Sequence, residues 1–558
     1  MTSFLGELRL GRFRWDLIYP FPQQPSADQA LGDRAVADLR ATIDDLDAAH
    51  TNGSPDWSAP GVIKALSAAG LLSLTVPATD GGRGLSGFNT FRILEEASRR
   101  SGALGLMLSV HNALGVPAYL PALAPGALRD YVTSALAAGT LCGVADTEPD
   151  GAANRERRTR AVACPGGYLL SGEKTFIGNG LTAGLLAVSA TVDDTGRIDL
   201  FLVDTASAGF SVIARHDFMG LEGAASAALR LDRVFVPHGN VLVAFDGGWR
   251  SSALVARINA LARLYITVAP AAAAARDCLA WSREFLRRRQ VDGRPLADYD
   301  AVAHRLSASL AEVFALDSVV RWCLLGADAD QRGPERTSAK NIGTMLAWRI
   351  VDRTMSLCGA EGFETAASKA RRGVPPLPIE QAMRDARGLR IAGGVDFNID
   401  FRAAQSGILP SYYAGTVCDA DLARAVADPI DLRGAPLSAA NRRNLETVRA
   451  RIAALGVRCL RLTRAHPEPD LQDRQCVLIA VNRIADELFT VSVVLAAAAS
   501  HRGPDPDLAQ ELAQTYCDSA LARVETWQQQ VDAPEQMRPE RLSSAWMAGG
   551  LAATMAGR

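Results

Sequence analysis

The sequence lacks a surplus of either charge. Its 59 Lys and Arg residues are balanced by 61 Asp and Glu residues, which leaves a net charge of −2 at pH 7. We therefore do not expect a nucleic-acid-binding protein that works through bulk charge. The hydrophobic fraction of 48% and the charged fraction of 22% are typical of a folded chain and exclude disorder throughout. At 558 residues the chain exceeds the size of one hydrophobic core, so we expect several domains.

Cysteines and histidines do not occur at the spacings that are typical of metal sites or disulfide frameworks. The nine cysteines are scattered without a CxxC pair, and the seven histidines contain no pair at i, i+3 or i+4 spacing. These spacings argue against structural zinc and against a disulfide scaffold, and they predict a reducing, cytoplasmic location with no metal site. No GxSxG run is present, so the sequence does not support a hydrolase.

Long uncharged apolar runs are absent. The N-terminus carries Glu7 and Asp16 and has no apolar core long enough for a signal peptide. The apolar stretch 253–280 is interrupted by three arginines, and the stretch 488–500 is too short to cross a bilayer. We therefore expect no membrane span.

The periodicity of apolar residues changes twice along the chain. Helical spacing dominates before Gly139, short β-prone runs separated by turns follow to about residue 245, and alanine-rich helical spacing returns from 247. The expected strands are 141–146, 167–177, 185–192, 197–204, 210–215 and 228–236. Segment 366–380 is expected to be a loop, because it contains Gly373 and three prolines.

These changes predict an α+β fold in four parts. They are an N-terminal helical domain (1–138), a small antiparallel β domain (139–246), a C-terminal helical bundle (247–424) and an extra helical domain (425–558). One GxGxxG run occurs at 82–87, but Pro77 separates it from the preceding apolar run, whereas a dinucleotide fingerprint needs a strand that leads directly into the turn. We interpret it as a loop with Ser86 near a helix N-cap.

Six segments in order carry a pattern distributed over the chain. They are LTVPATDGGRGLS (74–86), ADTEPDGAAN (145–154), YLLSGEKTFIGNG (168–180), HDFMGLEGAASAALRLDRVFVP (216–237), SAKNIGTMLAWRIVDRTMSLCGAEGF (338–363) and MRDARGLRIAGG (383–394). At this spacing the chain resembles the acyl-CoA dehydrogenases over about 31–405. The tail segments 481–501 and 512–524 resemble the extra helical domain of the very-long-chain members.

The resemblance implies an FAD site and assigns residues to it. The matching positions in the β domain are Val144, Asp146 and Thr147 in the first β loop and Phe176, Ile177 and Gly178 in a second segment. Arg289 matches the arginine that binds the flavin diphosphate. Gly359 and Gly362 match a turn that, in the family, approaches a flavin held by a neighbouring subunit. Gly178 removes a hydroxyl that the family places near flavin N5. Near the substrate, Ala153 replaces a frequent serine, and Arg263 matches an arginine close to the thioester.

The catalytic glutamate of the family has no counterpart. Counting on from the RDAR element, its position falls at Gly393, and the alternative base position beside Arg263 is Ala262. Three explanations stay open. Asp396 replaces the glutamate, the substrate needs no carboxylate base, or catalysis is lost.

The resemblance implies an FAD-dependent oxidoreductase that dehydrogenates an acyl thioester, on coenzyme A or an acyl carrier protein, at its α,β bond. Such a reaction removes an α-proton that the thioester carbonyl acidifies, while a β-hydride leaves to the flavin. A flavin-dependent monooxygenase or oxidase on the same fold is the alternative, and a catalytically inactive flavin-binding scaffold is the third. An electron-transfer flavoprotein or oxygen would accept the electrons, and we expect a homodimer or homotetramer.

Overall fold

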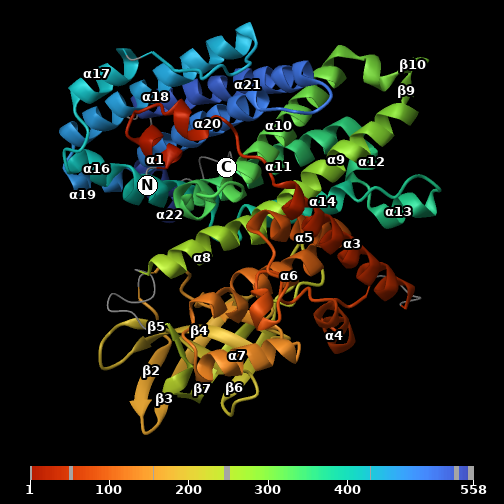
Figure 1. Ribbon diagram of the computed structural model, residues 1–558, viewed down its shortest axis with the longest axis vertical. Coiled ribbons are helices and arrows are strands. Elements are labelled where there is room, and N and C mark those ends of the chain that lie inside the picture. The colour runs from red at the N-terminus through yellow and green to blue at the C-terminus, as the bar shows by residue number, and fades with distance from the viewer. Residues whose placement is uncertain are drawn as a thin grey trace.

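The computed structural model describes residues 3–49, 55–154, 156–243, 252–427, 429–532 and 539–550. The predicted boundary between the β domain and the bundle, at 246/247, lies outside the described residues. Helices and an eight-stranded sheet occupy the regions that the periodicity predicts, so the α+β fold class is confirmed (Figure 1). A second sheet of two short strands, β9 (Gln290–Val291) and β10 (Arg294–Pro295), lies in the bundle and was not predicted. Figure 1 shows the sheet at one end of the molecule and the long helices at the other.

Five α-helices form the N-terminal helical domain between residues 26 and 137. They are α3 (Ser26–Ala48), α4 (Pro60–Ala68), α5 (Gly87–Arg100), α6 (Gly102–Ala113) and α7 (Ala127–Ala137). Ser86 caps α5 by accepting a hydrogen bond from the Asn89 amide, as the sequence predicts. Ser101 ends α5 and caps α6, so the two helices meet at one residue and pack closely. The GxGxxG run is therefore a loop before a capped helix.

The β domain is one eight-stranded sheet. Its strands are β1 (Cys142–Ala145), β2 (Arg160–Cys164), β3 (Gly167–Ile177), β4 (Leu185–Val192), β5 (Ile198–Asp204), β6 (Phe210–Arg215), β7 (Ala227–Pro237) and β8 (Val241–Val243). The order is β6-β7-β3-β2-β4-β5-β8, with β1 on β4. The expectation of a purely antiparallel domain is wrong, because β1 and β2 each pair with β4 in parallel. Strands β2 and β8 were not predicted.

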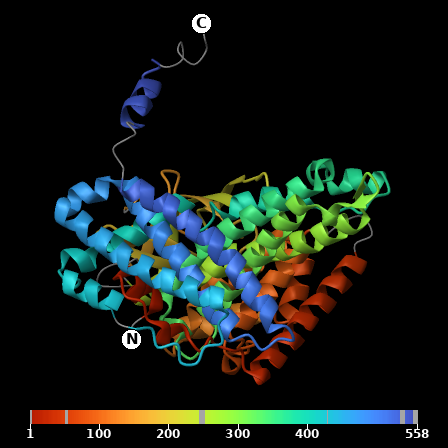
Figure 2. The same cartoon turned by 90° about the horizontal axis from the view of Figure 1, so that it is seen from above.

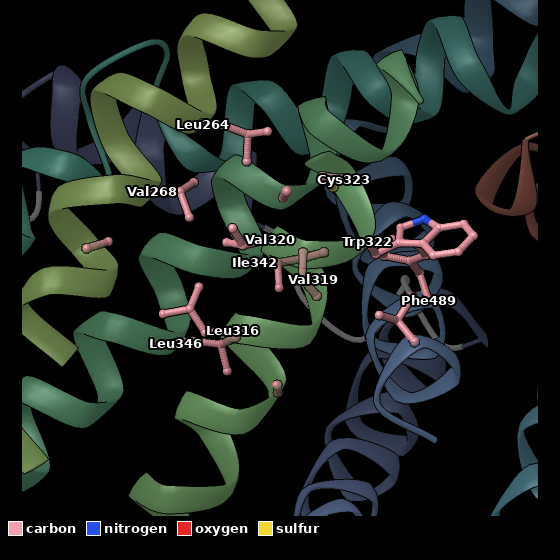
Figure 3. Packing of buried hydrophobic residues seen from close by; sticks show 14 of the residues in the cluster. Leu264, Val268, Leu316, Val319, Val320, Trp322, Cys323, Ile342, Leu346 and Phe489 are labelled. Atoms are coloured by element: carbon pink, nitrogen blue, oxygen red, sulfur yellow. The ribbon is translucent and has the colours of Figure 1, made fainter. Parts of the chain in front are cut away.

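The C-terminal bundle is built around a long, bent apolar helix. This helix consists of α8 (Ala253–Arg263), one π-helical turn (Leu264–Val268) and α9 (Ala269–Arg288). Taken together it is the one described helix that is long and apolar enough by itself to cross a membrane, and 72% of its apolar window is buried inside the protein. Helices α10 (Asp300–Leu324) and α11 (Gly333–Cys358) pack on it. Figure 3 shows Leu264 and Val268 of the π-helical turn facing Val320 and Leu316 of α10.

Shorter helices follow α11. They are α12 (Ala360–Phe363), α13 (Ala366–Arg371), α14 (Ile379–Leu389), α15 (Asp396–Gly407), α16 (Leu409–Tyr413) and α17 (Asp419–Ala427). Segment 366–380 is thus not entirely a loop, because Thr365 caps the short helix α13 by accepting a hydrogen bond from the Ser368 amide. The predicted boundary at 424/425 falls inside α17.

The extra helical domain contains α18 (Ala439–Ala465), α19 (Glu468–Asp473), α20 (Gln475–Ala499), α21 (Pro506–Asp532) and α22 (Pro539–Met547). Figure 2 shows α22 standing away from the other helices. The N-terminal helix α1 (Phe4–Arg9) lies on this domain (Figure 1), and α2 (Trp15–Ile18) follows it. The Phe4 and Phe489 rings lie 6.3 Å apart, and the Tyr412 hydroxyl donates to the Arg9 carbonyl at 2.9 Å. The first residues of the chain therefore pack with the last helices rather than with the helical domain that follows them.

Candidate functional site

The two predicted flavin segments of the β domain lie side by side. The Thr175 amide donates to the Thr147 carbonyl at 2.9 Å, which links the residue before Phe176 to the first β loop. A Cβ added at Gly143, next to Val144, would lie 2.8 Å from the Gly178 carbonyl oxygen. The structure thus brings Val144–Thr147 and Phe176–Gly178 together at one end of the sheet.

Phe176 presents an aromatic face on this surface. Its backbone adopts φ +56°, and 60% of the residue is exposed. Such a conformation is uncommon for a bulky residue and is found preferentially at functional sites. The Phe176 ring lies 4.7 Å from the His216 ring, which in turn stacks at 6.0 Å on Phe218. The buried residue Ile177 points into the sheet core instead.

Asp146 turns inward rather than toward this surface. Its carboxylate accepts hydrogen bonds from the Arg157 guanidinium at 2.8 Å and from the Ser189 hydroxyl at 2.6 Å. Burial opposes ionisation of Asp146, but Arg157 outweighs it, and the pKa of the carboxyl is lowered. Thr147 is half-buried, and its hydroxyl has no hydrogen-bond partner among the described residues. Thr147 therefore has the free polar group of this loop.

A buried ion pair supports the loop from below. The Lys174 ammonium, which is fully buried, contacts the Glu148 carboxylate at 2.9 Å. Glu148 also accepts from the amides of Arg158 and Thr159. Burial opposes ionisation of Glu148, but the hydrogen bonds from Thr159 and Lys174 outweigh it and lower the pKa of Glu148 to about 2. Neither residue was a sequence-predicted site residue, although both stand inside the quoted motifs.

Gly178 leaves room for a neighbouring helix. A Cβ at this position would lie 3.0 Å from Cγ2 of Val110 on α6, so a larger side chain would press on that helix. The next residue, Asn179, donates to the Met107 and Cys142 carbonyls and fixes the strand end against α6. Glycine at position 178, where the family has a hydroxyl residue, thus allows β3 to pack closely against α6.

Arg263 and Gly393 meet on the bundle side. The Arg263 Nε donates to the Gly393 carbonyl at 3.2 Å, and the π-helical turn Leu264–Val268 follows directly. Gly393 and Gly394 adopt φ +68° and +113°, so the turn requires glycine at 394 and favours it at 393, where another residue would be strained. π-Helical turns are frequent at functional sites, and this one begins one residue after Arg263. The residues that the family resemblance assigns to the base and the thioester therefore do lie in contact.

Lys340 on α11 holds the glycine turn in place. Its side chain is fully buried, and the ammonium donates to the Arg390 carbonyl at 2.9 Å and to the Gly394 carbonyl at 2.8 Å. Burial lowers the pKa of Lys340 to about 8, and the nearby Arg263 acts in the same direction while Asp396 opposes it. Sequence reasoning missed Lys340, although it stands inside the quoted motif 338–363.

Arg402 on α15 joins the bundle to the flavin loop. It donates to the Ala153 carbonyl at 2.9 Å. Neither Arg263 nor Arg402 has a carboxylate within ion-pair distance among the described residues. Burial lowers the pKa of Arg263, and repulsion from Arg402 lowers it further. The site around Gly393 is therefore positively charged.

Asp396 is engaged in other contacts. The Arg390 guanidinium donates to its carboxylate at 2.5 and 3.0 Å, and the Phe397 amide donates at 2.8 Å at the start of α15. Burial opposes ionisation of Asp396, but Arg390 outweighs it, and the pKa of the carboxyl is lowered. A carboxylate so held is a weak base, and it must leave Arg390 before it can take a proton. Its assignment as the replacement base stays a prediction.

The remaining predicted flavin residues lie at the far end of α9. Arg289 caps the C-terminus of this 20-residue helix, which is about 30 Å long. Gly359 and Gly362 lie nearby, because Arg288 forms an ion pair with Glu361 between them. A Cβ at Gly359 would enter open space, whereas at Gly362 it would clash with the Met355 carbonyl. Within one chain these residues are separated from the β-domain segments by the length of α9 (Figure 1).

Comparisons with known proteins agree with the resemblance. Models of the N-terminal, middle and C-terminal domains of acyl-CoA dehydrogenases match residues 29–140, 143–234 and 256–397. The chain is 31% identical to the probable acyl-CoA dehydrogenase FadE10 of Mycobacterium tuberculosis, over 94% of this chain and 85% of that protein. It is 23% identical to the very long-chain specific acyl-CoA dehydrogenase of Macaca fascicularis, over 71% of this chain and 60% of that protein.

The fold also has close structural neighbours. The crystal structure of an acyl-CoA dehydrogenase from Bacillus anthracis complexed with FAD superposes with a TM-score of 0.79 at 19% identity, and the match covers 98% of this chain and 94% of that one. A glutaryl-CoA dehydrogenase in its glutaryl-CoA complex gives a TM-score of 0.58 at 21% identity, over 69% of this chain and 96% of that one. At these identities the likeness concerns the fold.

Proposed function

Because the chain belongs to the acyl-CoA dehydrogenase family, we propose that it is an FAD-dependent oxidoreductase that dehydrogenates an acyl thioester at its α,β bond. Three observations support the proposal. Arg263 donates to the Gly393 carbonyl, Arg402 donates to the Ala153 carbonyl of the flavin loop, and Arg402 is near enough to Arg263 to lower its pKa by charge repulsion.

The site residues that the β domain contributes are suited to bind a flat ring system. The exposed Phe176 face offers an apolar plane, and the Thr147 hydroxyl and the Gly178 backbone offer hydrogen-bonding groups beside it. FAD bound there would supply a two-electron acceptor. The chain's own part is to hold the acyl group against this surface and to place a positive charge at its carbonyl end. Arg263, which has no carboxylate partner, is the residue suited to polarise the thioester oxygen.

A second copy of the chain would complete the cofactor site. Arg289 and Gly359 lie near the C-terminal end of α9, which points away from the β domain (Figure 1), so a single FAD held at Phe176 is not expected to reach them. The open space at Gly359 and the exposed Arg289, which has no side-chain partner among the described residues, are suited to receive the diphosphate part of a flavin from a neighbouring subunit. We therefore propose a homodimer or homotetramer. A cytoplasmic location agrees with nine cysteines that are all free thiols.

The test of the dehydrogenase is anaerobic reduction of the flavin. Purified holoenzyme is mixed with acyl thioesters of increasing chain length, on coenzyme A and on an acyl carrier protein, and the flavin absorbance is followed. We expect bleaching with at least one series and re-oxidation by an electron-transfer flavoprotein. No bleaching with any chain length or carrier refutes the proposal.

The missing carboxylate favours one alternative. No acidic side chain lies within ion-pair distance of Arg263 among the described residues, so a reaction without a carboxylate base, such as flavin-dependent oxygenation or oxidation, fits the same site. Oxygen uptake that depends on a supplied reduced flavin, without anaerobic bleaching by thioesters, would identify it. Protein that binds FAD but does neither would be a scaffold.

A further inference from the structure

A cavity of about 460 Å³ lies between the N-terminal helical domain and the bundle, apart from the site described above. Its walls are α3, α5, α9, α10 and the segment that leads into α3. This volume is in the range of cavities that hold small molecules. Phe88 and Phe91 form an apolar wall, and Gln29 and three arginines contribute polar groups.

Two of the three arginines have acidic partners. Arg276 donates to the Glu95 carboxylate at 2.5 Å and to Asp317 at 3.0 Å, so one guanidinium is matched by two carboxylates. Arg92 forms an ion pair with Asp33 outside the cavity. These contacts neutralise both arginines and also use both acidic side chains of the lining.

Arg321 is the exception. Its guanidinium lies 5.4 Å from the centre of the Phe88 ring and makes no hydrogen bond or ion pair within the part of the chain that the structure describes. Burial lowers the pKa of Arg321, and repulsion from Arg276 and Arg92 adds to this, while Asp317 opposes it. The face of this half-buried guanidinium lies on the Phe88 ring, and its N–H groups can therefore donate to another partner.

Gln29 offers a second free group. Its side-chain amide has no hydrogen-bond partner among the described residues, and it lines the same cavity as Arg321. A guanidinium fork is suited to two oxygens of a carboxylate or phosphate, and an amide N–H can donate to another.

We propose that this cavity binds a small anion, a carboxylate or a phosphate, through Arg321 and Gln29, with any apolar part of the ligand against Phe88 and Phe91. The bound anion supplies the charge partner that the protein does not give Arg321. The proposal does not depend on the reaction at the flavin site, because Arg321 and Gln29 belong to neither predicted flavin segment.

The test is calorimetric titration of the FAD-loaded protein with inorganic phosphate and, separately, with benzoate. We expect saturable binding of at least one probe, and the probe that binds more tightly distinguishes a phosphate from a carboxylate ligand. Arg321→Gln is expected to weaken this binding at least ten-fold, and Gln29→Leu several-fold. Arg321→Lys, which keeps the charge but loses the fork, should fall between Arg321→Gln and the wild type.

Arg305→Gln is the matched control, because Arg305 is an exposed arginine on the same helix, α10, outside the cavity. It should bind as the wild type does. Circular dichroism of each variant checks that it folds, and Gln29→Leu and Arg321→Lys keep the test informative if Arg321→Gln does not. Absence of saturable binding of both probes, or equal binding by the wild type and the Arg321 variants, overturns the proposal.

Discussion

Gly393→Glu tests whether the missing base limits dehydrogenation. A Cβ at this position would lie 3.6 Å from Cγ of Arg263 and 3.7 Å from Cγ2 of Thr267, which are ordinary contacts. The added carboxylate would therefore reach the surroundings of Arg263 without displacing the backbone. Because φ is +68°, the larger residue costs about 1–2 kcal/mol of stability. Lys340 should keep its hydrogen bonds to the Arg390 and Gly394 carbonyls.

A positioned general base typically contributes about 10²–10⁴-fold to a proton-transfer step. We therefore expect Gly393→Glu to raise the rate of anaerobic flavin reduction by an acyl thioester at least ten-fold over the wild type. Gly393→Gln is the control, because it has the same backbone strain and nearly the same size but no carboxylate. Stopped-flow absorbance gives the rates, and thermal unfolding gives the stability cost.

The reasoning is refuted if Gly393→Glu and Gly393→Gln reduce the flavin at the same rate while both remain folded. That result would mean that the wild-type protein already has an effective base, or that the reaction needs none. A larger loss of stability than about 2 kcal/mol would show that the turn tolerates no side chain.

Three further predictions follow from buried charges. Asp396→Asn should abolish flavin reduction by thioesters if Asp396 is the base. An unchanged rate would mean that Asp396 is not the base and that it serves as the ion-pair partner of Arg390. Glu148→Gln should destabilise the protein by about 3–5 kcal/mol in thermal unfolding, because it leaves Lys174 buried without a charge partner. Since the pKa of Glu148 is held at about 2, its contribution to the free energy of unfolding should be complete above about pH 4.5 and be lost as the pH falls toward 2. Glu148→Gln should therefore make stability less dependent on pH in this acid range. Burial raises the pKa of Asp486 to about 7, so stability should fall as the pH rises from about 4 to 7, and Asp486→Asn should raise the melting temperature at pH 8 more than at pH 5.

The predictable parts of the fold are those with local causes. Helices α5 and α20 show apolar residues at helical spacing, and Ser86 marks a helix start because its side chain can accept an amide hydrogen bond. The strands with clear alternation or long apolar runs, β3 and β4 above all, were also predicted. Strand β2 was missed, although the shorter β1 was predicted, because only one of the five residues of β2 is buried and its sequence gives no apolar alternation.

The strand pairing could not be predicted from such patterns. The parallel pairing of β1 with β4 places Val144 beside Ala187, more than forty residues away, and only the three-dimensional path of the chain decides this. The same holds for the position of α1 on α20, where Arg9 contacts Asn482. Local periodicity carries no information on contacts at this sequence separation.

For the site, the sequence determined which residue types are available and which are absent. The family resemblance assigns Arg263 to the thioester and Gly393 to the base position, and it predicts that no glutamate stands at either family base position. That prediction uses residue types alone.

The tertiary structure alone decided how the charges near these residues are used. In the structure Asp396 pairs with Arg390, and Lys340 donates hydrogen bonds to the glycine turn. Arg263 has no acidic partner among the residues that the structure describes. The reason is physical. The effect of a charge depends on its burial and on neighbours within a few ångströms, and those neighbours come from helices that are far apart in the chain.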